Sequence, residues 1–245
     1  MNQCIVWQRA PENFQLCAQE VHIWKINLKV SPSEMEFYRR VLSGDEIARA
    51  ERFYFPQHQE RFIVGRAFLR KILSKYINVE AKEIEFEYEE RGKPLLGLKF
   101  KHCGICFNLS HSQDLGLCGV SHNRLIGVDL ESIRHTSDIE NLAKRFFSVR
   151  EYEVIKSVAP EEQQEIFFRY WTCKEAYLKA TGKGLSELSQ IELELMPNKS
   201  AKLCVQGDWQ LRELVPAENF AAAVVIANHN HLDRFRFWEP CSAIY

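Results

Sequence analysis

Two long stretches of helical pattern constrain the fold most strongly, and short strand-like segments follow each of them. In the first, from Pro56 to Ile77, apolar residues recur at spacings of three and four, which places them on one face of a helix. The second begins at Pro160 and ends near Gly182, a residue suited to closing a helix. Because each helix precedes alternating apolar segments, we predict a duplicated α+β chain with halves at residues 1–124 and 125–245.

Composition excludes several classes of protein. The 245 residues include 32 basic and 33 acidic ones, a formal charge of −1, so the chain lacks the basic excess of a general nucleic-acid binder. No apolar run approaches the ~20 residues of a membrane-spanning helix, and the start shows no signal-peptide pattern. The eight cysteines of such a chain are expected to be reduced. We therefore predict a soluble cytoplasmic protein that binds neither nucleic acid nor membrane.

The segment from Ile126 to Glu131 is the sharpest local feature. On a strand its apolar side chains point to one face, so that Asp129 and Glu131 point together to the other. Adjacent carboxylates repel unless a cation lies between them, and such hard oxygen ligands suit Mg²⁺ or Mn²⁺. Taken alone, the segment favours the alternative interpretation, two surface acids at the solvated end of a strand.

A helical segment from Trp171 to Lys179 adds to this pattern. Trp171, Glu175 and Lys179 stand four residues apart and fall along one face. Glu175 supplies a third carboxylate, and Lys179 offers a positive charge to a phosphate. The alternative is a packed tryptophan beside an ordinary surface ion pair.

Two further polar segments have both a functional and a structural interpretation. Residues 108–112, Asn-Leu-Ser-His-Ser, lie where a strand enters a loop, where they bind a phosphate or cap their own backbone. Five basic residues lie along the first long helix. We expect them to form a solvated face, and the alternative is that they attract an acidic partner. They are Arg61, Arg66, Arg70, Lys71 and Lys75.

The order of these features resembles that of the Sfp-type 4′-phosphopantetheinyl transferases, and most closely their cyanobacterial members. The family pattern G-[IV]-D-x-E appears at residues 127–131, F-[FS]-x-x-E within Phe146–Glu151, and W-[ST]-x-K-E-[AS]-x-x-K at Trp171–Lys179. Upstream matches are Arg52-Phe53-Tyr54, Gly92-Lys93-Pro94 and Asn108–Ser112. The resemblance covers about residues 49–184.

The resemblance implies a fold and a reaction. The fold would be two similar α+β halves related by a pseudo-twofold axis, with coenzyme A bound between them. The reaction would move the phosphopantetheine arm of coenzyme A to a serine of an apo acyl or peptidyl carrier protein and release adenosine 3′,5′-bisphosphate. Carrier proteins and coenzyme A are thus the implied partners, and Mg²⁺ or Mn²⁺ the implied metal.

Roles follow from the resemblance position by position. Asp129, Glu131 and Glu175 would hold the metal, while Glu175 (or a water) takes the serine proton and Lys179 stabilises charge on the phosphates. The implied coenzyme A contacts are Arg49, Arg61, Gly92, Lys93, Ser110, His111 and Lys179. Trp171 and Lys174 would shape the site.

Two positions depart from the better-known bacterial pattern. A lysine can precede the Arg49 position by three residues, but this chain has Glu46. A small hydroxyl residue can follow Arg61, but this chain has Phe62. Both departures concern the adenosine end of coenzyme A.

Two other classes of function fit the residues alone. Three carboxylates and a lysine also suit a metal-dependent phosphoesterase. A non-catalytic module that binds carrier protein or coenzyme A is the third class, although it would not need an intact set of acids. We further expect a monomer that serves a broad range of fatty-acid, polyketide or peptide carriers.

Overall fold

The computed structural model describes residues 5–136, 138–195, 200–227 and 234–240. These residues divide into two compact units. The N-terminal unit comprises residues 7–123 and 234–240, and the C-terminal unit comprises residues 124–227 with residues 5 and 6. The chain therefore passes from one unit to the other at residue 124, and its last described strand returns to the first unit.

The N-terminal unit combines a sheet with a long helix. Its elements are β1 (Gln8–Arg9), β2 (Glu20–Asn27), α1 (Pro32–Arg39), α2 (Gly44–Ala50), α3 (Pro56–Ile77), η1 (Ala81–Glu83), β3 (Phe86–Tyr88), β4 (Pro94–Leu96), η2 (Leu98–Cys103), β5 (Ile105–Ser112), β6 (Leu115–His122) and β12 (Arg234–Glu239).

The C-terminal unit repeats the order from β2 to β6, with η2 as the exception. Its elements are β7 (Ile126–Ser132), α4 (Ile139–Phe146), α5 (Val149–Ser157), α6 (Pro160–Thr181), η3 (Leu185–Gln190), β8 (Glu192–Glu194), β9 (Lys202–Cys204), β10 (Trp209–Leu214) and β11 (Phe220–Ala227). The prediction of an α+β chain with two similar halves is confirmed.

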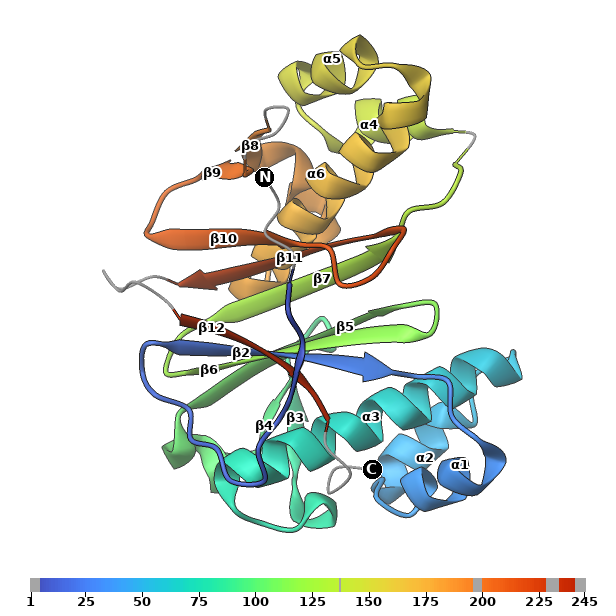
Figure 1. Cartoon of the computed structure of the whole chain (residues 1–245), viewed down its shortest axis with the longest axis vertical. Coiled ribbons are helices and arrows are strands. Elements are labelled where there is room, and N and C mark those ends of the chain that lie inside the picture. Colours follow the sequence, from blue (N-terminus) through green and yellow to red (C-terminus); the bar gives the residue numbers. More distant parts are fainter. Residues whose placement is uncertain (1–4, 137, 196–199, 228–233, 241–245) are drawn as a thin grey trace. The chain divides into compact units, whose positions relative to one another are not determined.

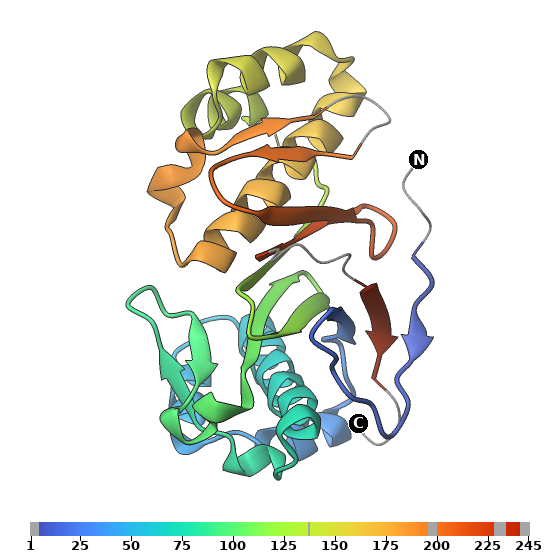
Figure 2. The same cartoon turned by 90° about the vertical axis from the view of Figure 1, so that its left-hand side faces the viewer.

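Each unit has its own sheet, and both sheets contain three antiparallel strands in the same arrangement. Strands β5, β6 and β2 lie side by side in one unit, and β10, β11 and β7 in the other. Figure 1 shows α3 and α6 each running along the sheet of its own unit, and Figure 2 shows them from the side. Strands β12 and β1 extend only the first sheet, in parallel orientation.

Local sequence signals explain where the helices begin and end. Proline occupies the first turn of both α3 and α6, where its missing N–H costs nothing. Both helices close on a left-handed residue, Asn78 (φ 53°) and Gly182 (φ 72°). The Ser148–Glu151 pair forms the predicted capping box. Pattern and structure thus agree on α3 to the residue.

The basic residues of α3 do not all form the solvated face that we expect from the sequence. Arg66 and Arg70 are only 7% and 2% exposed. They lie on the same helical face as Phe62, because the three residues are four positions apart. The expectation is therefore wrong for these two arginines, and the cause is an acidic partner on α2 that is described below.

Two predictions that depend on the absence of a feature apply to the described residues only. Of the eight cysteines, the six that the structure describes are free, and Cys4 and Cys241 lie outside the described residues. Within the described ranges, no helix is long and apolar enough to cross a membrane.

Candidate active site in the C-terminal unit

Strand β7 carries the acidic pair that the sequence singles out. Asp129 is only 3% exposed, and the apolar residues Ile126, Val128 and Leu130 are buried as well. Glu131 lies near the end of the strand, where 26% of its side chain is exposed. This burial excludes the alternative interpretation for Asp129, an acid at the solvated end of a strand.

Gly127 explains how this strand comes close to helix α6. A Cβ atom at residue 127 would lie 2.0 Å from the carbonyl oxygen of Ala176 and 2.4 Å from the nitrogen of Ala180. No side chain fits at such distances, so only glycine lets the strand backbone rest on the helix. The face of β7 that carries Asp129 is thereby held against the helix that carries Glu175.

Helix α6 presents its functional residues one turn apart. Lys179 donates a hydrogen bond of 2.6 Å from Nζ to Oδ1 of Asp129, which joins helix and strand. Burial raises the pKa of Glu175 to about 7, and the negative charges of Asp129 and Glu131 raise it too, whereas Lys179 lowers it. The structure thus brings the four predicted residues of this unit into one electrostatically coupled cluster.

The donor set fits a hard divalent cation. It consists of carboxylate oxygens only, and Oε1 of Glu175 is buried with no hydrogen-bond partner. In the described part of the chain, however, no three Asp, Glu, His or Cys side chains are already arranged to hold a metal ion. In place of a metal ion, the Nζ of Lys179 contacts Oδ1 of Asp129, to which it donates a hydrogen bond. Metal binding at these residues stays a prediction, and it requires Lys179 to move or share its partner.

A buried ion pair supports the helix next to Glu175. The Nζ of Lys174 donates to Oε2 of Glu151 at 2.5 Å and to the carbonyl oxygen of Leu188 at 3.1 Å. The other carboxylate oxygen of Glu151 accepts from the backbone of Leu193 at 2.9 Å. Lys174 and Glu151 are 0% and 1% exposed, so they connect α5 and α6 with η3 and β8 rather than contact solvent.

Apart from Lys179 on α6, the residues predicted to contact coenzyme A lie in the N-terminal unit. Arg61 of α3 bonds Asp114 at 2.9 Å, in the turn after β5, and the exposed Arg49 of α2 lies over the ring of Tyr88. Lys93 follows Gly92 (φ 80°) in the turn between β3 and β4. Burial lowers the pKa of Lys93, and Glu89 and Cys106 raise it. Ser110 is buried on β5, whereas the neighbouring His111 is exposed.

Sequence reasoning missed the group around Glu46. This residue is 1% exposed, and its Oε2 accepts from Nε of Arg70 at 2.6 Å. Nε of Arg66 lies 3.5 Å from its other oxygen. The signal was present in the sequence, since Ser43 and Glu46 have the spacing of a capping box and the two arginines share a face with Phe62.

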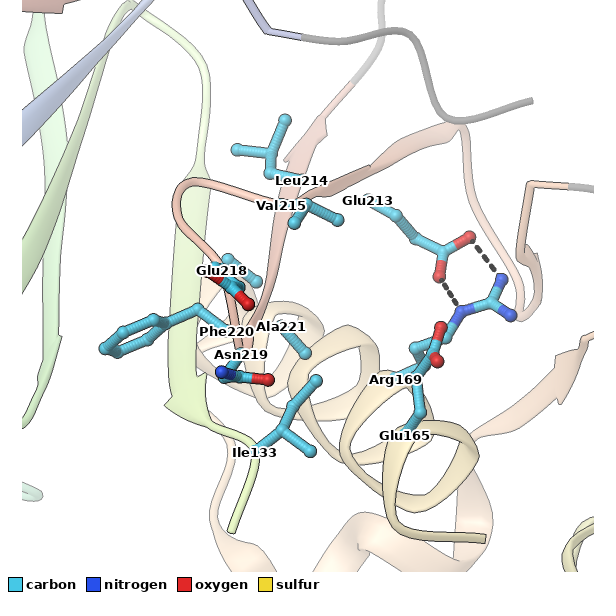
Figure 3. A pocket seen from close by; sticks show the side chains of 11 residues that line it. Ile133, Glu165, Arg169, Glu213, Leu214, Val215, Glu218, Asn219, Phe220 and Ala221 are labelled. Carbon is cyan, nitrogen blue, oxygen red and sulfur yellow. Dashed lines mark hydrogen bonds and ion pairs between the residues drawn. The ribbon is translucent and has the colours of Figure 1, made fainter. Parts of the chain in front are cut away.

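A pocket of about 290 Å³ lies elsewhere in the C-terminal unit. Figure 3 shows its lining, in which Arg169 binds both carboxylate oxygens of Glu213. Apolar side chains such as Ile133, Val215 and Phe220 complete the wall. None of the predicted catalytic or metal-binding residues lines this pocket, so the acid cluster is a separate feature.

Comparison with known proteins decides the family. Residues 125–225 match the model of the 4′-phosphopantetheinyl transferase superfamily, and residues 28–122 match that of its N-terminal domain. A 4′-phosphopantetheinyl transferase of Nostoc, HetI, is 52% identical over 96% of both chains. The chain belongs to the 4′-phosphopantetheinyl transferase superfamily.

More distant relatives agree with this assignment. The 4′-phosphopantetheinyl transferase Sfp of Bacillus subtilis is 32% identical over 64% of this chain and 67% of its own. A holo-(acyl-carrier-protein) synthase of Bacillus anthracis, solved in complex with coenzyme A, aligns with 41% of this chain and 92% of its own. That alignment has a TM-score of 0.37 and 23% identity, and the assignment rests on the sequence matches instead.

The resemblance read from the sequence is thus confirmed, including the stronger likeness to a cyanobacterial relative than to Sfp. So is the prediction that the chain is an enzyme of the 4′-phosphopantetheinyl transferase family. The acid cluster lies within the superfamily match, and Arg49, Arg61, Lys93 and His111 lie within the N-terminal match.

Proposed function

We propose that this protein transfers the 4′-phosphopantetheine arm of coenzyme A to a serine of apo carrier proteins. The observation that carries the proposal is the coupled cluster of Asp129, Glu175 and Lys179 inside the superfamily match. The reaction depends on Mg²⁺ and releases adenosine 3′,5′-bisphosphate. The protein acts as a cytoplasmic monomer on acyl and peptidyl carriers.

The proposed step is a displacement at the β-phosphorus of coenzyme A. The serine oxygen bonds to this phosphorus as the bond from phosphorus to the bridging oxygen breaks, and the electron pair leaves on adenosine 3′,5′-bisphosphate. Glu175, or a water that it holds, takes the serine proton. In the metal-free protein, burial raises the pKa of Glu175 to about 7.

The other residues act on charge. Lys179, which now bonds Asp129, turns to the phosphates and offsets the charge that grows on the leaving oxygen. Asp129, Glu131 and Glu175 would hold Mg²⁺, which supplies electrostatic stabilisation of the diphosphate when bound. In the N-terminal unit, Arg49, Arg61, Gly92, Lys93, Ser110 and His111 bind coenzyme A.

The test is intact-mass spectrometry of apo carrier proteins after incubation with the enzyme, coenzyme A and Mg²⁺. We expect a gain of one phosphopantetheinyl group on fatty-acid, polyketide and peptide carriers, which EDTA and Glu175→Ala abolish. No gain on any carrier, with folded enzyme, would contradict the proposal and favour a binding module.

Two controls address the remaining alternatives. Release of product without carrier protein would instead indicate a phosphoesterase. A concentration-dependent shift to twice the chain mass in sedimentation would exclude the monomer.

A further inference from the structure

The pocket of the C-terminal unit lies at a place that has a counterpart in the N-terminal unit. A backbone hydrogen bond identifies both places. The nitrogen of Ile133, directly after β7, donates to the carbonyl oxygen of Asn219 at 2.8 Å. The nitrogen of Leu28, directly after β2, donates to that of Asp114 at 2.8 Å. Since Asn219 directly precedes β11 and Asp114 directly precedes β6, the two turns are equivalent.

In the N-terminal unit, an arginine joins this turn to the long helix. Arg61 is the sixth residue of α3. Its Nη2 donates to Oδ1 of Asp114 at 2.9 Å and to Oε1 of Gln113 at 3.3 Å, and its Nε donates to the same oxygen of Asp114 at 3.0 Å. The guanidinium group therefore links the helix to two side chains of the turn.

In the C-terminal unit, acids stand at the corresponding positions and line the pocket. The sixth residue of α6 is Glu165, and the turn before β11 contains Glu218 and Asn219. All three line the pocket of about 290 Å³, the first on α6 and the other two in the turn (Figure 3). Among the described residues, no hydrogen bond or ion pair joins Glu165 to Glu218 or Asn219. The linking cation of Arg61 thus has no counterpart here.

The remaining charges of the pocket do not supply this cation. Among the described residues that line the pocket, Arg169 is the one cation, and its Nε and Nη2 donate to the two carboxylate oxygens of Glu213 at 2.8 and 3.2 Å. Burial lowers the pKa of Arg169, whereas Glu213 and Glu165 raise it. Glu165 and Glu218 are both exposed, so each adds a negative charge that a ligand can reach. The pocket therefore attracts a cation.

Apolar side chains determine which kind of cation fits. Ile133, Val215 and Phe220 form part of the wall. Pockets for small molecules are lined in this way, by apolar side chains with a few polar groups that fix the orientation of the ligand. A hydrated metal ion gains nothing from an apolar wall, and the acids repel an anion such as the phosphates of coenzyme A. A guanidinium group on an apolar chain suits both parts of the pocket, because its planar donors match carboxylates.

We propose that this pocket binds a small organic cation, a guanidinium group on a short apolar chain, between Glu165 and Glu218. The guanidinium takes the part that Arg61 plays in the N-terminal unit, and the chain packs against the apolar wall. A free guanidino compound and the arginine side chain of a peptide carry this same chemistry. The site is separate from the acid cluster, so the proposal does not depend on the proposed function.

The decisive experiment compares a cation with a neutral molecule of the same shape. Isothermal titration calorimetry on the full chain measures the binding of butylguanidinium and of butylurea. We expect the wild type to prefer butylguanidinium by about tenfold or more, and the double variant Glu165→Gln with Glu218→Gln to lose this preference. The matched control is Glu161→Gln with Glu162→Gln, which removes two exposed acids of α6 that do not line the pocket and should keep the preference.

A second variant builds the cation into the chain. In Glu165→Arg, the new guanidinium group should reach Glu218 as Arg61 reaches Asp114 in the other unit. We expect this variant to lose the preference for butylguanidinium, because the place of the ligand is then taken by a side chain. Binding that persists at the strength of the wild type in Glu165→Arg would contradict the proposed position of the cation.

The other outcomes are equally distinct. The proposal is overturned if the wild type does not distinguish the two probes, if the Glu165 and Glu218 double variant keeps the preference, or if the control pair loses it equally. N-acetyl-arginine methylamide distinguishes the sources of the ligand, because tighter binding than that of butylguanidinium indicates the arginine of a peptide and weaker binding indicates a free compound. Carrier proteins that stay unmodified would contradict the proposed function alone, since none of these variants changes its residues.

Discussion

Each unit contains a buried glutamate–cation pair at an equivalent position, but the side chains next to this pair differ between the units. In both, the third residue of a short helix is a glutamate that bonds the backbone of its own N-cap, and the fifteenth residue of the following long helix is its cation. The pairs are Glu46 with Arg70 and Glu151 with Lys174. Even the second acceptor is equivalent, the carbonyl of Ile84 in one unit and that of Leu188 in the other.

The units differ one residue further along the long helix and on the strand that it covers. Trp24 pairs with the fourth residue of β6 in the N-terminal unit, and Asp129 pairs with the fourth residue of β11 in the C-terminal unit. The sixteenth helix residue is Lys71 in α3 and Glu175 in α6. One unit fills the strand–helix interface with aromatic side chains, and the other keeps carboxylates there.

The aromatic side chains of the N-terminal unit contact one another through their polar atoms. The hydroxyl of Tyr76 accepts from Nε1 of Trp24 at 2.8 Å and lies 2.7 Å from Nδ1 of His22. At the corresponding places of the C-terminal unit, Ala180 faces Gly127 and leaves no room for a side chain. Both units thus keep the glutamate–cation pair, whereas the neighbouring layer is an aromatic core in one unit and a cluster of charged side chains in the other.

The largest expected effect is a loss of activity when the acids of the C-terminal unit are replaced. Glu175→Gln and Asp129→Asn should lower kcat/KM for carrier modification by about 10²–10⁴-fold, because each removes a charge from the proposed site. Lys71→Gln changes the equivalent helix position of the other unit and should alter the rate by no more than about twofold. A comparable loss in Lys71→Gln would contradict the assignment of function to the C-terminal unit.

Breaking the shared scaffold should affect stability in both units, but unequally. Lys174→Met leaves Glu151 buried without its cation and should lower the free energy of unfolding by about 3–5 kcal/mol, measured by urea denaturation. Arg70→Met should cost less, since Arg66 remains 3.5 Å from Glu46. The double change Glu151→Leu with Lys174→Met should recover much of the loss. Equal losses for the two single variants would show that Arg66 contributes nothing to Glu46.

The close approach of strand to helix can be tested by adding one methyl group. Gly127→Ala places a carbon against the backbone of α6 and should lower the free energy of unfolding by about 3 kcal/mol or more, along with activity. Gly44→Ala is the matched control, because its Cβ would meet nothing within 4 Å. It should be neutral or stabilising by up to about 1 kcal/mol. An undisturbed melting temperature in Gly127→Ala would mean that strand and helix are not in this contact.

The smallest expected effect is a pair of opposite pH responses. Glu175 has a folded pKa of about 7 against 4.5, so the metal-free protein should lose stability as pH rises from about 4.5 to about 7. Burial lowers the pKa of His22 to about 4 from 6.5, so its unit should lose stability as pH falls through that interval. Urea midpoints across pH in EDTA measure both, and Glu175→Gln should remove the first slope alone. A slope unchanged in Glu175→Gln would contradict the raised pKa.

Periodicity and capping in the sequence were sufficient to predict the elements around the site. The pattern from Pro56 to Ile77 specified α3, because apolar spacing and a proline in the first turn are local signals. The alternation around Asp129 and the four-residue spacing of Glu175 and Lys179 likewise predicted which side chains share a face. Their order along the chain identified the family, which the comparisons confirm.

Only the tertiary structure decided which charges are buried and with whom they pair. Local pattern cannot distinguish a solvated Arg70 from one that meets Glu46, since the partners are 24 residues apart and come together only when α2 packs on α3. The same holds for Lys179 on Asp129, and for the return of β12 to the first sheet more than 200 residues along the chain. Spacing along one element is written into the sequence, whereas burial and long-range pairing follow from how elements pack, and they fix both the ion pairs and the pKa of Glu175.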